Sequence, residues 1–545
     1  MKTCELKSID LRALQARIAA QQHKNSVFTF EKGQVVKRSH ADVHADVAAA
    51  CARLTAWGLQ AGMRVGICAP NCYEWVIYDL ALLELRAVII AFPDEFAKVR
   101  RDDLCAKYAL SLLLVSKADA QPENDRYAPV AYLDGENTEF KNVSPGRRDI
   151  DPDYDRVGGI FSSGSAGGLK GLTLNRRGIE ASIDAFAQAV SPQHDDCLLL
   201  FLPISNFQQR LMYYAAFWYG FDLIVTDPNR LFRALKELHP TILIAPPTLY
   251  EAFETRFYNL PPWKRWMAQL LADIALNIPI RSIREKTARL LFKEVYEALG
   301  GRLRFMVTGM APIKRSTLKL CRRMQLPLFE TYGLIEFGSV SLNLPGANKL
   351  GSVGRLLPGV NLEFATDGEI IAHREHTIAL GYFECAGEES KKTFISNGSV
   401  ATGDIGRMDT DGYLYLVGRK KEIIITSGGE KVHPELLEAE IDACVEVARS
   451  VVFRSPDSPA LVAVVLPKNP QEKDVRNRIQ RFIDGVNERR PSMSVGKVIF
   501  TDLAFTRENG FLLPNLKLDR NKIAQTFQSQ ITNKGAESQA RTRSA

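Results

Sequence analysis

The chain has 545 residues, of which 46% are apolar and 24% are charged. These proportions are typical of a globular protein that is large enough to contain more than one domain. The formal net charge of +7 is modest for this length and suits an anionic small molecule or a membrane surface, but no basic stripe interleaved with aromatic residues favours a nucleic acid as partner.

No targeting or membrane-spanning segment is evident in the sequence. The first ten residues, MKTCELKSID, lack the apolar core of a secretory signal, and the longest apolar region, from Trp75 to Phe92, is interrupted by three charged residues. The nine cysteines are scattered and form no CxxC motif, which favours reduced thiols. We therefore expect a cytoplasmic protein.

The first 120 residues predict an α/β domain. Helical patches and a hairpin around Phe28 to Val36 come first. Next come a strand at 64–69, a helix at 73–85 and strands at 87–92 and 110–116. Crossovers of this length imply parallel strands. His40 and His44 are four residues apart on the predicted helix, but without a third ligand we interpret them as surface histidines rather than a metal site.

The stretch from Ile160 to Gly171 reads IFSSGSAGGLKG and follows a predicted strand, Val157 to Phe161. Its glycines allow backbone N–H groups to turn toward an anion, its serines add donors, and Lys170 adds a positive charge. The Walker A order is absent, because Leu169 precedes Lys170 and Gly171 follows it. By itself the stretch is compatible with a phosphate-binding loop or with a Gly/Ser loop carrying a solvated lysine.

The rest of the chain predicts two further kinds of structure. A helix at 175–190 and strands at 198–203, 222–226, 241–245, 303–307 and 327–330 continue the α/β pattern, whereas short alternating runs at 349–417 predict an antiparallel sheet. After Arg419 the pattern is that of a separate α+β domain of about a hundred residues. We expect an N-terminal domain at 1–418, with the antiparallel subdomain at about 349–418, a C-terminal domain at 419–528, and a disordered tail at 529–545.

A long helical stretch from Pro262 to Leu299 is both amphipathic and basic, and it contains Trp263 and Trp266. Two interpretations are open. In the first, which we favour, the helices pack on the protein and their basic faces are solvated. In the second, they contact a membrane, such as the inner membrane face, or another anionic partner.

Four stretches in this order together resemble the adenylate-forming superfamily of acyl-CoA synthetases. They are SSGSAGGLKG, ETYGLIEFG, TGDIGRMDTDGYLYLVGRKKEIIITSGGEKVHP and LLPNLKLDR. The resemblance covers roughly residues 60–525, and the third stretch is the most specific. The segments SGGEKVHP and PNLKLDR are more similar to the long-chain fatty acyl-CoA branch than to other branches.

The resemblance implies a two-step reaction. A carboxylate attacks the α-phosphorus of ATP to give an acyl-adenylate and pyrophosphate, and a thiol then displaces AMP to give a thioester. The implied cofactors are ATP, Mg2+ and CoA, or the phosphopantetheine of a carrier protein. The C-terminal domain of this superfamily rotates between the two steps, so the resemblance also implies that this domain is mobile.

The resemblance also assigns roles to individual residues. The β- and γ-phosphates would be surrounded by Ser163, Gly164, Ser165, Gly167, Lys170 and Gly171. The rest of the nucleotide site would comprise Gly309, Met310, Ala311, Tyr332 (stacked on adenine), Gly333, Asp404 (on the ribose) and Arg419. Glu336 would bind Mg2+, Lys517 would stand beside the reacting carboxylate, and Asn206 would lie near the acyl carboxylate. Lys420 would be the hinge, and Ser427, Gly428 and Gly429 would approach the thiol channel.

This chain departs from the family pattern at four places. Ser165-Ala166 replaces Thr-Thr, Leu169 replaces Pro, Ile335 replaces a threonine that contacts the α-phosphate, and Asn206 replaces a histidine or an aromatic residue. Three functions follow: activation of a medium- or long-chain fatty acid for transfer to CoA, which we favour; loading of an acyl carrier protein; or an attenuated nucleotide- or acyl-binding protein. The charged residues Lys170, Glu336, Asp404, Arg419 and Lys517 are retained, which argues against the third. Chain length and oligomeric state are not predicted.

Overall fold

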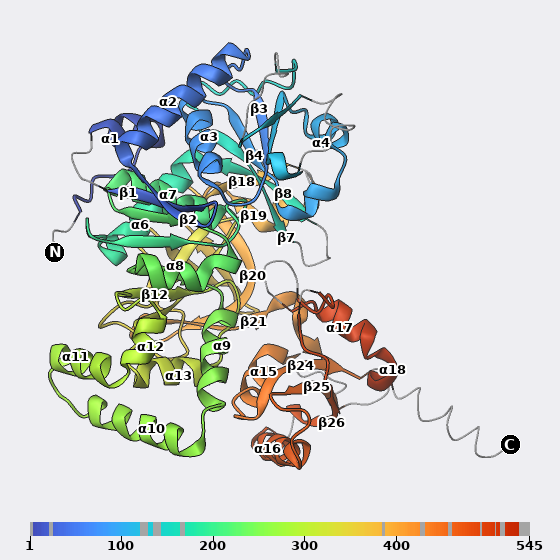
Figure 1. Ribbon diagram of the computed structural model, residues 1–545. Helices are drawn as coiled ribbons and strands as arrows, with labels where there is room; N and C mark the ends of the chain where they lie inside the picture. The colour runs from blue at the N-terminus through green and yellow to red at the C-terminus, as the bar shows by residue number, and fades with distance from the viewer. Residues whose placement is uncertain are drawn as a thin grey trace.

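The structure is a computed structural model. It describes residues 4–20, 25–119, 129–134, 143–163, 169–383, 387–425, 431–455, 460–490, 493–506, 508–512 and 518–532. Figure 1 shows a large body built from the N-terminal three quarters of the chain, with a smaller C-terminal part packed beside its lower end. The fold is the mixed α/β arrangement predicted from the sequence.

A seven-stranded sheet forms the upper part of the body (Figure 1). Its order is β18-β8-β7-β4-β3-β5-β6, and β3 pairs in parallel with both β4 and β5, as the crossover lengths predict. The inner strands are continuous apolar runs because both faces are covered. The bounds are β3 (Arg64–Cys68), β4 (Val88–Ala91), β5 (Leu112–Val115), β6 (Val130–Tyr132), β7 (Arg156–Ser163), β8 (Leu169–Asn175) and β18 (Ala379–Tyr382).

A nine-stranded sheet lies below it, in the order β15-β14-β13-β12-β11-β9-β10-β1-β2. The strand predicted at 327–330 is longer than expected. It continues to Leu334 because its second half pairs antiparallel with β14. The bounds are β1 (Ser26–Glu31), β2 (Gln34–Ser39), β9 (Cys197–Leu200), β10 (Asp222–Val225), β11 (Ile242–Ala245), β12 (Phe305–Thr308), β13 (Leu328–Leu334), β14 (Gly338–Leu342) and β15 (Arg355–Leu356).

Helix α6 joins the two sheets, and α7 packs beside it. Helix α6 contacts β8 of the first sheet and β14 of the second, and α7 contacts β9 and β10. The helical bounds are α1 (Leu14–Ala20), α2 (His40–Ala56), α3 (Tyr73–Glu84), α4 (Arg101–Tyr108), α6 (Arg176–Val190), α7 (Phe207–Tyr219), α8 (Leu231–Leu238), α9 (Pro247–Tyr258), α10 (Pro262–Leu276), α11 (Arg281–Leu291), α12 (Lys293–Ala298), α13 (Arg315–Arg323) and α14 (Glu388–Thr393).

The helical stretch predicted at 262–299 consists of three helices, with breaks at 277–280 and at Phe292. One expectation about the helices is wrong. His40 is buried rather than on the surface, because α2 begins at His40 and its ring packs 5.1 Å from that of Phe217. His44, one turn further on, is half-buried and bonds Gln15 through Nδ1.

The antiparallel sheet predicted after residue 349 is present, in the order β16-β17-β20-β19, with β21 paired to β20. One strand of the same stretch, β18, instead pairs antiparallel with β8 and so belongs to the seven-stranded sheet. The bounds are β16 (Asn361–Phe364), β17 (Glu369–His373), β19 (Phe394–Ser396), β20 (Ser399–Met408) and β21 (Leu414–Arg419).

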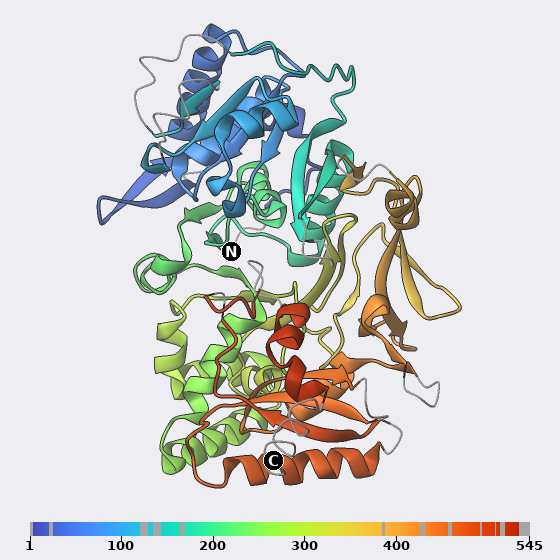
Figure 2. The same cartoon turned by 90° about the vertical axis from the view of Figure 1, so that its right-hand side faces the viewer.

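The C-terminal part has its own core and a three-stranded sheet, β24-β25-β26. The strand expected from KKEIIIT begins instead as a short 3-10 helix, Lys420–Glu422, and only the two residues of β22 are extended strand. The bounds are β22 (Ile424–Ile425), β23 (Lys431–Val432), α15 (Pro434–Ile441), β24 (Val447–Arg454), β25 (Leu461–Pro467), α16 (Val475–Arg489), β26 (Val495–Phe500), α17 (Arg520–Thr526) and α18 (Gln528–Ile531). Figure 2 shows this part lying across the end of the body.

Polar contacts hold the C-terminal part against the body. Glu251 on α9 forms a 2.6 Å ion pair with Arg449 on β24. The Nζ of Lys314 donates to the backbone carbonyl of Val447 at 3.2 Å and to that of Ala448. Interfaces of this polar kind are typical of domains that move relative to one another.

Candidate active site

Tyr332, Asp404 and Arg419 meet at one point, although Tyr332 lies 72 residues before Asp404 in the sequence. The hydroxyl of Tyr332 on β13 donates to Oδ2 of Asp404 at 2.6 Å. The Nε of Arg419 lies 2.7 Å from Oδ1 of the same carboxylate, because Asp404 and Arg419 are opposite each other on β20 and β21. Each oxygen of the carboxylate thus has its own donor.

Burial controls the charges of this cluster. Tyr332 is 7% exposed and Asp404 is 6% exposed. Burial, with the adjacent charge of Asp404, holds the pKa of Tyr332 well above its usual value, so the phenol remains a donor. Burial, the largest single influence, would lower the pKa of Arg419, but the charge of Asp404 and smaller contributions from Tyr332, Glu422 and Glu336 together raise it. The site therefore keeps one buried carboxylate between a neutral and a cationic donor.

A second cluster contains Lys170, Glu336 and Tyr382. The hydroxyl of Tyr382 donates to Oε1 of Glu336 at 3.0 Å, and the Nζ of Lys170 lies 5.6 Å from the centroid of the Tyr382 ring. Tyr382 reaches this place because β18 pairs with β8, with Tyr382 opposite Leu172. Tyr382 lies outside the four motifs and was not predicted from the sequence, because only the β18–β8 pairing brings it to this cluster.

The hairpin of β7 and β8 carries Lys170. Gly164, Ser165 and Gly167, with the neighbouring Ala166, lie outside the described residues, as does the side chain of Ser163. On β8, a Cβ at Gly171 would lie 2.2 Å from the ring of Phe383, so packing alone requires a glycine there. Leu169 is half-buried against the aromatic cluster that includes Phe161 and Phe383. The aromatic packing accounts for a leucine at this position.

Gly309, Met310 and Ala311 follow β12 and are half-buried. A Cβ at Gly309 would lie 2.8 Å from the methyl group of Thr331, the residue before Tyr332. Gly333, the residue after Tyr332, sits at a register shift between β13 and β14, where a Cβ would lie 2.7 Å from a backbone oxygen. Glycines on both sides thus let the backbone approach Tyr332 closely.

Two departures from the family pattern have structural environments of their own. Asn206 is the N-cap of α7, and its buried Oδ1 has no hydrogen-bond partner among the described residues. Ile335 is half-buried and packs against the largest apolar core. Asn206 thus has an unused acceptor, whereas Ile335 offers only apolar contact.

Lys420 lies between the body and the C-terminal part. Its Nζ forms ion pairs with Asp367 at 2.7 Å and with Glu369 at 2.6 Å. The backbone N–H of Arg419 donates to Oε1 of Glu435, on α15, at 3.2 Å. The turn at Arg419 and Lys420 thus contacts the antiparallel sheet through Lys420 and the C-terminal part through Arg419. Ser427, Gly428, Gly429 and Lys517 lie outside the described residues.

Glu435 makes this turn sensitive to pH. Burial raises the pKa of Glu435 from 4.5 to about 7; the nearby Arg520 opposes this shift and the charge of Glu422 adds to it. Its folded-state pKa exceeds the unfolded value, so the stability that it contributes is present below about pH 4.5 and is lost as the pH rises through about 7. We expect Glu435→Gln to be more stable than the parent at pH 8 by on the order of 2 kcal/mol, and similar at pH 4.

Urea unfolding at both pH values measures this difference. The matched control is Glu375→Gln, whose side chain is 89% exposed and which we expect to change little at either pH. An equal loss of stability at both pH values in Glu435→Gln would contradict the prediction, because removing a buried charge can change the stability only at a pH at which the group is ionised.

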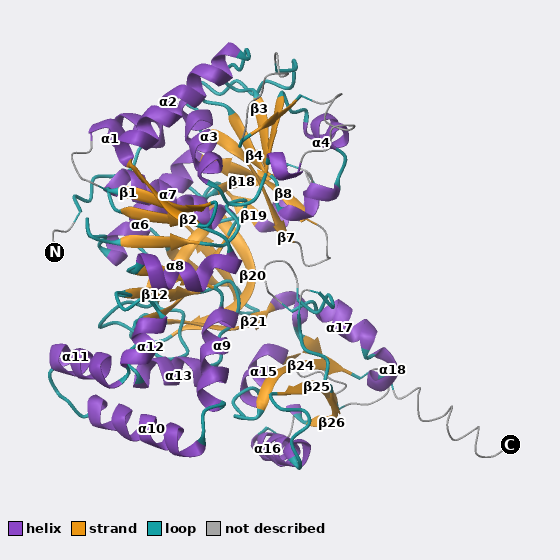
Figure 3. Cartoon of the chain, in the orientation of Figure 1, coloured by secondary structure: helices purple, strands orange, loops and turns teal. Residues whose placement is uncertain are grey.

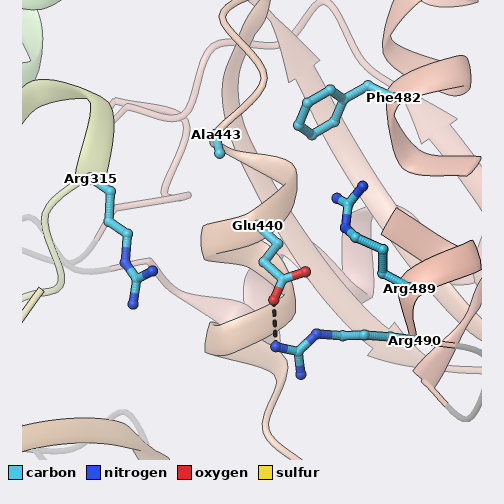
Figure 4. Close-up of a pocket in the computed structure, with 6 residues that line it drawn as sticks. All are labelled: Arg315, Glu440, Ala443, Phe482, Arg489 and Arg490. Carbon is cyan, nitrogen blue, oxygen red and sulfur yellow. Dashed lines mark ion pairs between the residues drawn. The ribbon is translucent and has the colours of Figure 1, made fainter. Parts of the chain in front are cut away.

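A cavity of about 620 Å³ opens elsewhere between the body and the C-terminal part (Figure 4). It is lined by Arg315, Glu440, Ala443, Phe482, Arg489 and Arg490, and Glu440 pairs with Arg490 at 2.6 Å. None of these residues belongs to the two clusters. Within the described ranges, no group of three or more His, Cys, Asp or Glu side chains could hold a metal ion.

Comparisons with known proteins define the class. The family described as AMP-binding enzyme matches residues 15–382, and the chain belongs to this family. The chain is similar to the long-chain-fatty-acid–CoA ligase FadD15 of Mycobacterium bovis, with 27% identity covering 90% of this chain and 91% of that protein. It is also similar to the human long-chain-fatty-acid–CoA ligase 1, with 26% identity covering 86% of this chain and 77% of that protein.

The fold is shared with solved structures. Against ATP-bound MatB from Rhodopseudomonas palustris, the TM-score is 0.74 with 21% identity, covering 96% of this chain and 100% of that one. This likeness shows that the chain, with its large N-terminal and smaller C-terminal part, shares the fold of that structure.

Proposed function

We propose that the protein activates a medium- or long-chain fatty acid with ATP as an acyl-adenylate and then transfers the acyl group to CoA. The observation that carries the proposal is the buried Asp404 carboxylate held between Tyr332 and Arg419, in a chain that aligns over 90% of its length with a long-chain-fatty-acid–CoA ligase. The eight described cysteines are free thiols, which agrees with a cytoplasmic location.

In this proposal the nucleotide lies over the Asp404 cluster. The two carboxylate oxygens would accept hydrogen bonds from the two ribose hydroxyls, and Arg419 would lie beside the ribose or the phosphates. Tyr332 would stack on adenine, with Gly309, Met310, Ala311 and Gly333 around it. Because Tyr332 is only 7% exposed, this stacking requires neighbouring side chains to move.

Glu336 and Lys170 would meet the phosphate end of ATP, with the loop from Ser163 to Gly171. A carboxylate oxygen suits Mg2+, a hard cation that usually keeps several waters and binds phosphates through one or two carboxylates. Glu336 would be such a carboxylate, and the hydroxyl of Tyr382 donates to its Oε1 and so would hold its orientation. Bound Mg2+ would neutralise phosphate charge during the reaction, and Lys170 would add a second positive charge.

The two half-reactions would use different parts of the C-terminal domain. Lys517 would stand beside the reacting carboxylate during adenylation, and Asn206 would lie near it. Ser427, Gly428 and Gly429 would line the thiol channel after rotation about Lys420.

ATP–pyrophosphate exchange with fatty acids of increasing chain length tests the first half-reaction. Absence of exchange with every carboxylate would reject it. Mass detection of the thioester formed with CoA, or with a phosphopantetheinylated carrier protein, separates the proposed function from carrier-protein loading.

An attenuated nucleotide-binding protein is the second candidate. It is favoured by the half-buried Ile335, which has no hydroxyl for the α-phosphate, and by the neutral Asn206. ATP binding without formation of any acyl-adenylate would favour this candidate over the first.

Tyr382→Phe tests the second cluster. The substitution keeps the ring beside Lys170 but removes the hydroxyl that donates to Glu336 at 3.0 Å. A hydrogen bond to a charged group contributes about 1.5–3 kcal/mol, so we expect exchange to slow by roughly 10- to 100-fold with an increased Mg2+ requirement. The control is Tyr415→Phe on β21, outside the cluster. A slowed rate with an unchanged Mg2+ dependence would contradict the role of Tyr382 in orienting Glu336.

A further inference from the structure

Helices α10 and α11 form a hairpin at the edge of the molecule, at the lower left of Figure 3. Of the five tryptophans in the chain, Trp57, Trp75 and Trp218 are at most 8% exposed. The other two, Trp263 and Trp266, are 59% and 64% exposed, and both lie on α10. The chain thus places its two exposed tryptophans one helical turn apart on the same element.

One face of α10 is apolar and exposed. Its side chains recur at helical spacing and are 44–64% exposed: Trp263, Trp266, Met267, Leu270 and Ile274. A different face of α10 provides Ala272 and Ala275, which join Ala288 of α11 in a small core under the hairpin. Helix α10 therefore has one apolar face that packs on the protein and a second that faces solvent.

Helix α11 extends the exposed apolar surface. Ile280, at its N-cap, is 55% exposed, and Ile283 and Leu290, seven residues apart on one side, are 48% and 75% exposed. A cluster of this kind on a monomer marks an interaction site rather than an ordinary surface.

The hairpin is positively charged. Residues 262–291 contain six basic and two acidic side chains. Both acids are already in ion pairs with arginines, Glu285 with Arg281 at 2.7 Å and Asp273 with Arg323 at 2.9 Å. The Nζ of Lys264 lies 5.4 Å from the centroid of the Trp263 ring, so positive charge borders the exposed tryptophans directly.

We propose that the α10–α11 hairpin, residues 262–291, docks on an anionic lipid bilayer, with α10 lying in the plane of the interface. Tryptophan is well suited to the boundary between headgroups and acyl chains, and adjacent lysines and arginines can extend to lipid phosphates. The positive charge of the hairpin favours an anionic bilayer over a second copy of the chain as the binding partner. A second copy of the chain would bring two positive hairpins together, whereas an anionic bilayer complements them.

The length of α10 defines the mode of binding. Its 15 residues extend about 22 Å, less than the roughly 30 Å hydrocarbon core of a bilayer. No helix in the described part of the chain is long and apolar enough to cross a membrane. The hairpin therefore lies on the membrane rather than through it. This inference is independent of the acyl substrate proposed above.

Vesicle binding by the full chain tests the proposal. We expect sedimentation with phosphatidylcholine vesicles that contain phosphatidylglycerol, weaker binding to phosphatidylcholine alone, and loss of binding as salt increases. Because the exposed tryptophans are both on α10, their emission should shift to the blue on binding, and lipids brominated in the acyl chain should quench it.

Substitutions separate the apolar face from the charge. We expect Trp266→Glu with Ile274→Glu to weaken binding to anionic vesicles at least tenfold, with an unchanged circular dichroism spectrum. Lys264→Glu with Lys286→Glu should weaken it at least fivefold for each charge removed. The matched control for the first pair is Phe232→Glu on α8, a 58% exposed aromatic elsewhere, which should bind as the parent does. Lys236→Glu on the same helix is the control for charge.

Three results would overturn the proposal. One is undiminished vesicle binding by the Trp266→Glu, Ile274→Glu variant. Another is equal binding to neutral and anionic vesicles. The third is an absence of vesicle binding together with self-association that this variant abolishes, which would assign the face to a second copy of the chain.

Discussion

Asp404→Ala is expected to lower kcat/KM for ATP in pyrophosphate exchange by about 10²- to 10³-fold. The carboxylate is the proposed acceptor for both ribose hydroxyls, and two hydrogen bonds to a charged group, at about 1.5–2 kcal/mol each, together contribute about 3–4 kcal/mol. The substitution also removes the partner of the Tyr332 hydroxyl at 2.6 Å and of Arg419 at 2.7 Å. We therefore expect a loss of about 1–3 kcal/mol in the free energy of unfolding as well.

The structural loss must be separated from the loss of ATP binding. Asp409→Ala is a matched control, because Asp409 lies in the turn between β20 and β21 and also pairs with a cation, Lys349 at 2.7 Å, but lies outside the cluster. We expect it to keep the exchange rate of the parent. Asp404→Asn, which keeps an acceptor for Tyr332, should retain more stability than Asp404→Ala but still bind ATP weakly. Parent-like ATP affinity in Asp404→Asn would contradict the ribose assignment.

Most of the strands could be predicted because their burial is simple. The apolar runs at 64–69, 87–92 and 110–116 are buried on both faces, so each predicted strand contains the observed one. The pairing of β18 with β8 could not be predicted, because it joins segments about two hundred residues apart and has no local signal. Because that pairing was not predicted, Tyr382 on β18 was not predicted as a site residue either.

The motifs name residues that lie together in the structure, but they do not reveal how these residues contact one another. The motifs assign Tyr332, Asp404 and Arg419 to one nucleotide, and the structure places the three side chains in contact. A motif does not indicate that Tyr332 donates to Asp404, since this depends on how two different sheets meet. At Gly171 the structure adds a second reason for the residue. The motif predicts a role near a phosphate, and the structure shows in addition that a side chain at this position would collide with Phe383, which the sequence does not reveal.

The assignment of Lys420 as the hinge stays a prediction. The contacts around this turn indicate what a rotation about Lys420 would cost in free energy. Rotation of the C-terminal domain about this residue would disturb the hydrogen bond from the backbone N–H of Arg419 to Glu435. The interface contacts of Glu251 and Lys314 would also have to break. All of these are polar contacts that water can replace, so the cost of opening is smaller than for an apolar interface of the same area.

Lys517→Ala is expected to reduce acyl-adenylate formation by about 10²- to 10³-fold, the usual effect of removing one group that stabilises developing charge. In the proposed adenylation step, an anionic carboxylate approaches the anionic triphosphate, and a lysine between them offsets the repulsion. Thioester formation from supplied acyl-adenylate needs no such approach, and we expect it to change less than threefold by the same reasoning. Mass detection of adenylate and thioester measures the two steps separately.

Lys522→Ala is the matched control, because it removes the same charge five residues later. Lys522 lies on α17 with an exposed side chain, where its backbone N–H is capped by Asp519 at 2.9 Å and does not depend on the ammonium group. We expect both half-reactions of this variant to match the parent. If Lys517→Ala instead slows both half-reactions equally, Lys517 does not act in one step alone, and the assignment of one conformation of the C-terminal domain to each half-reaction loses its support.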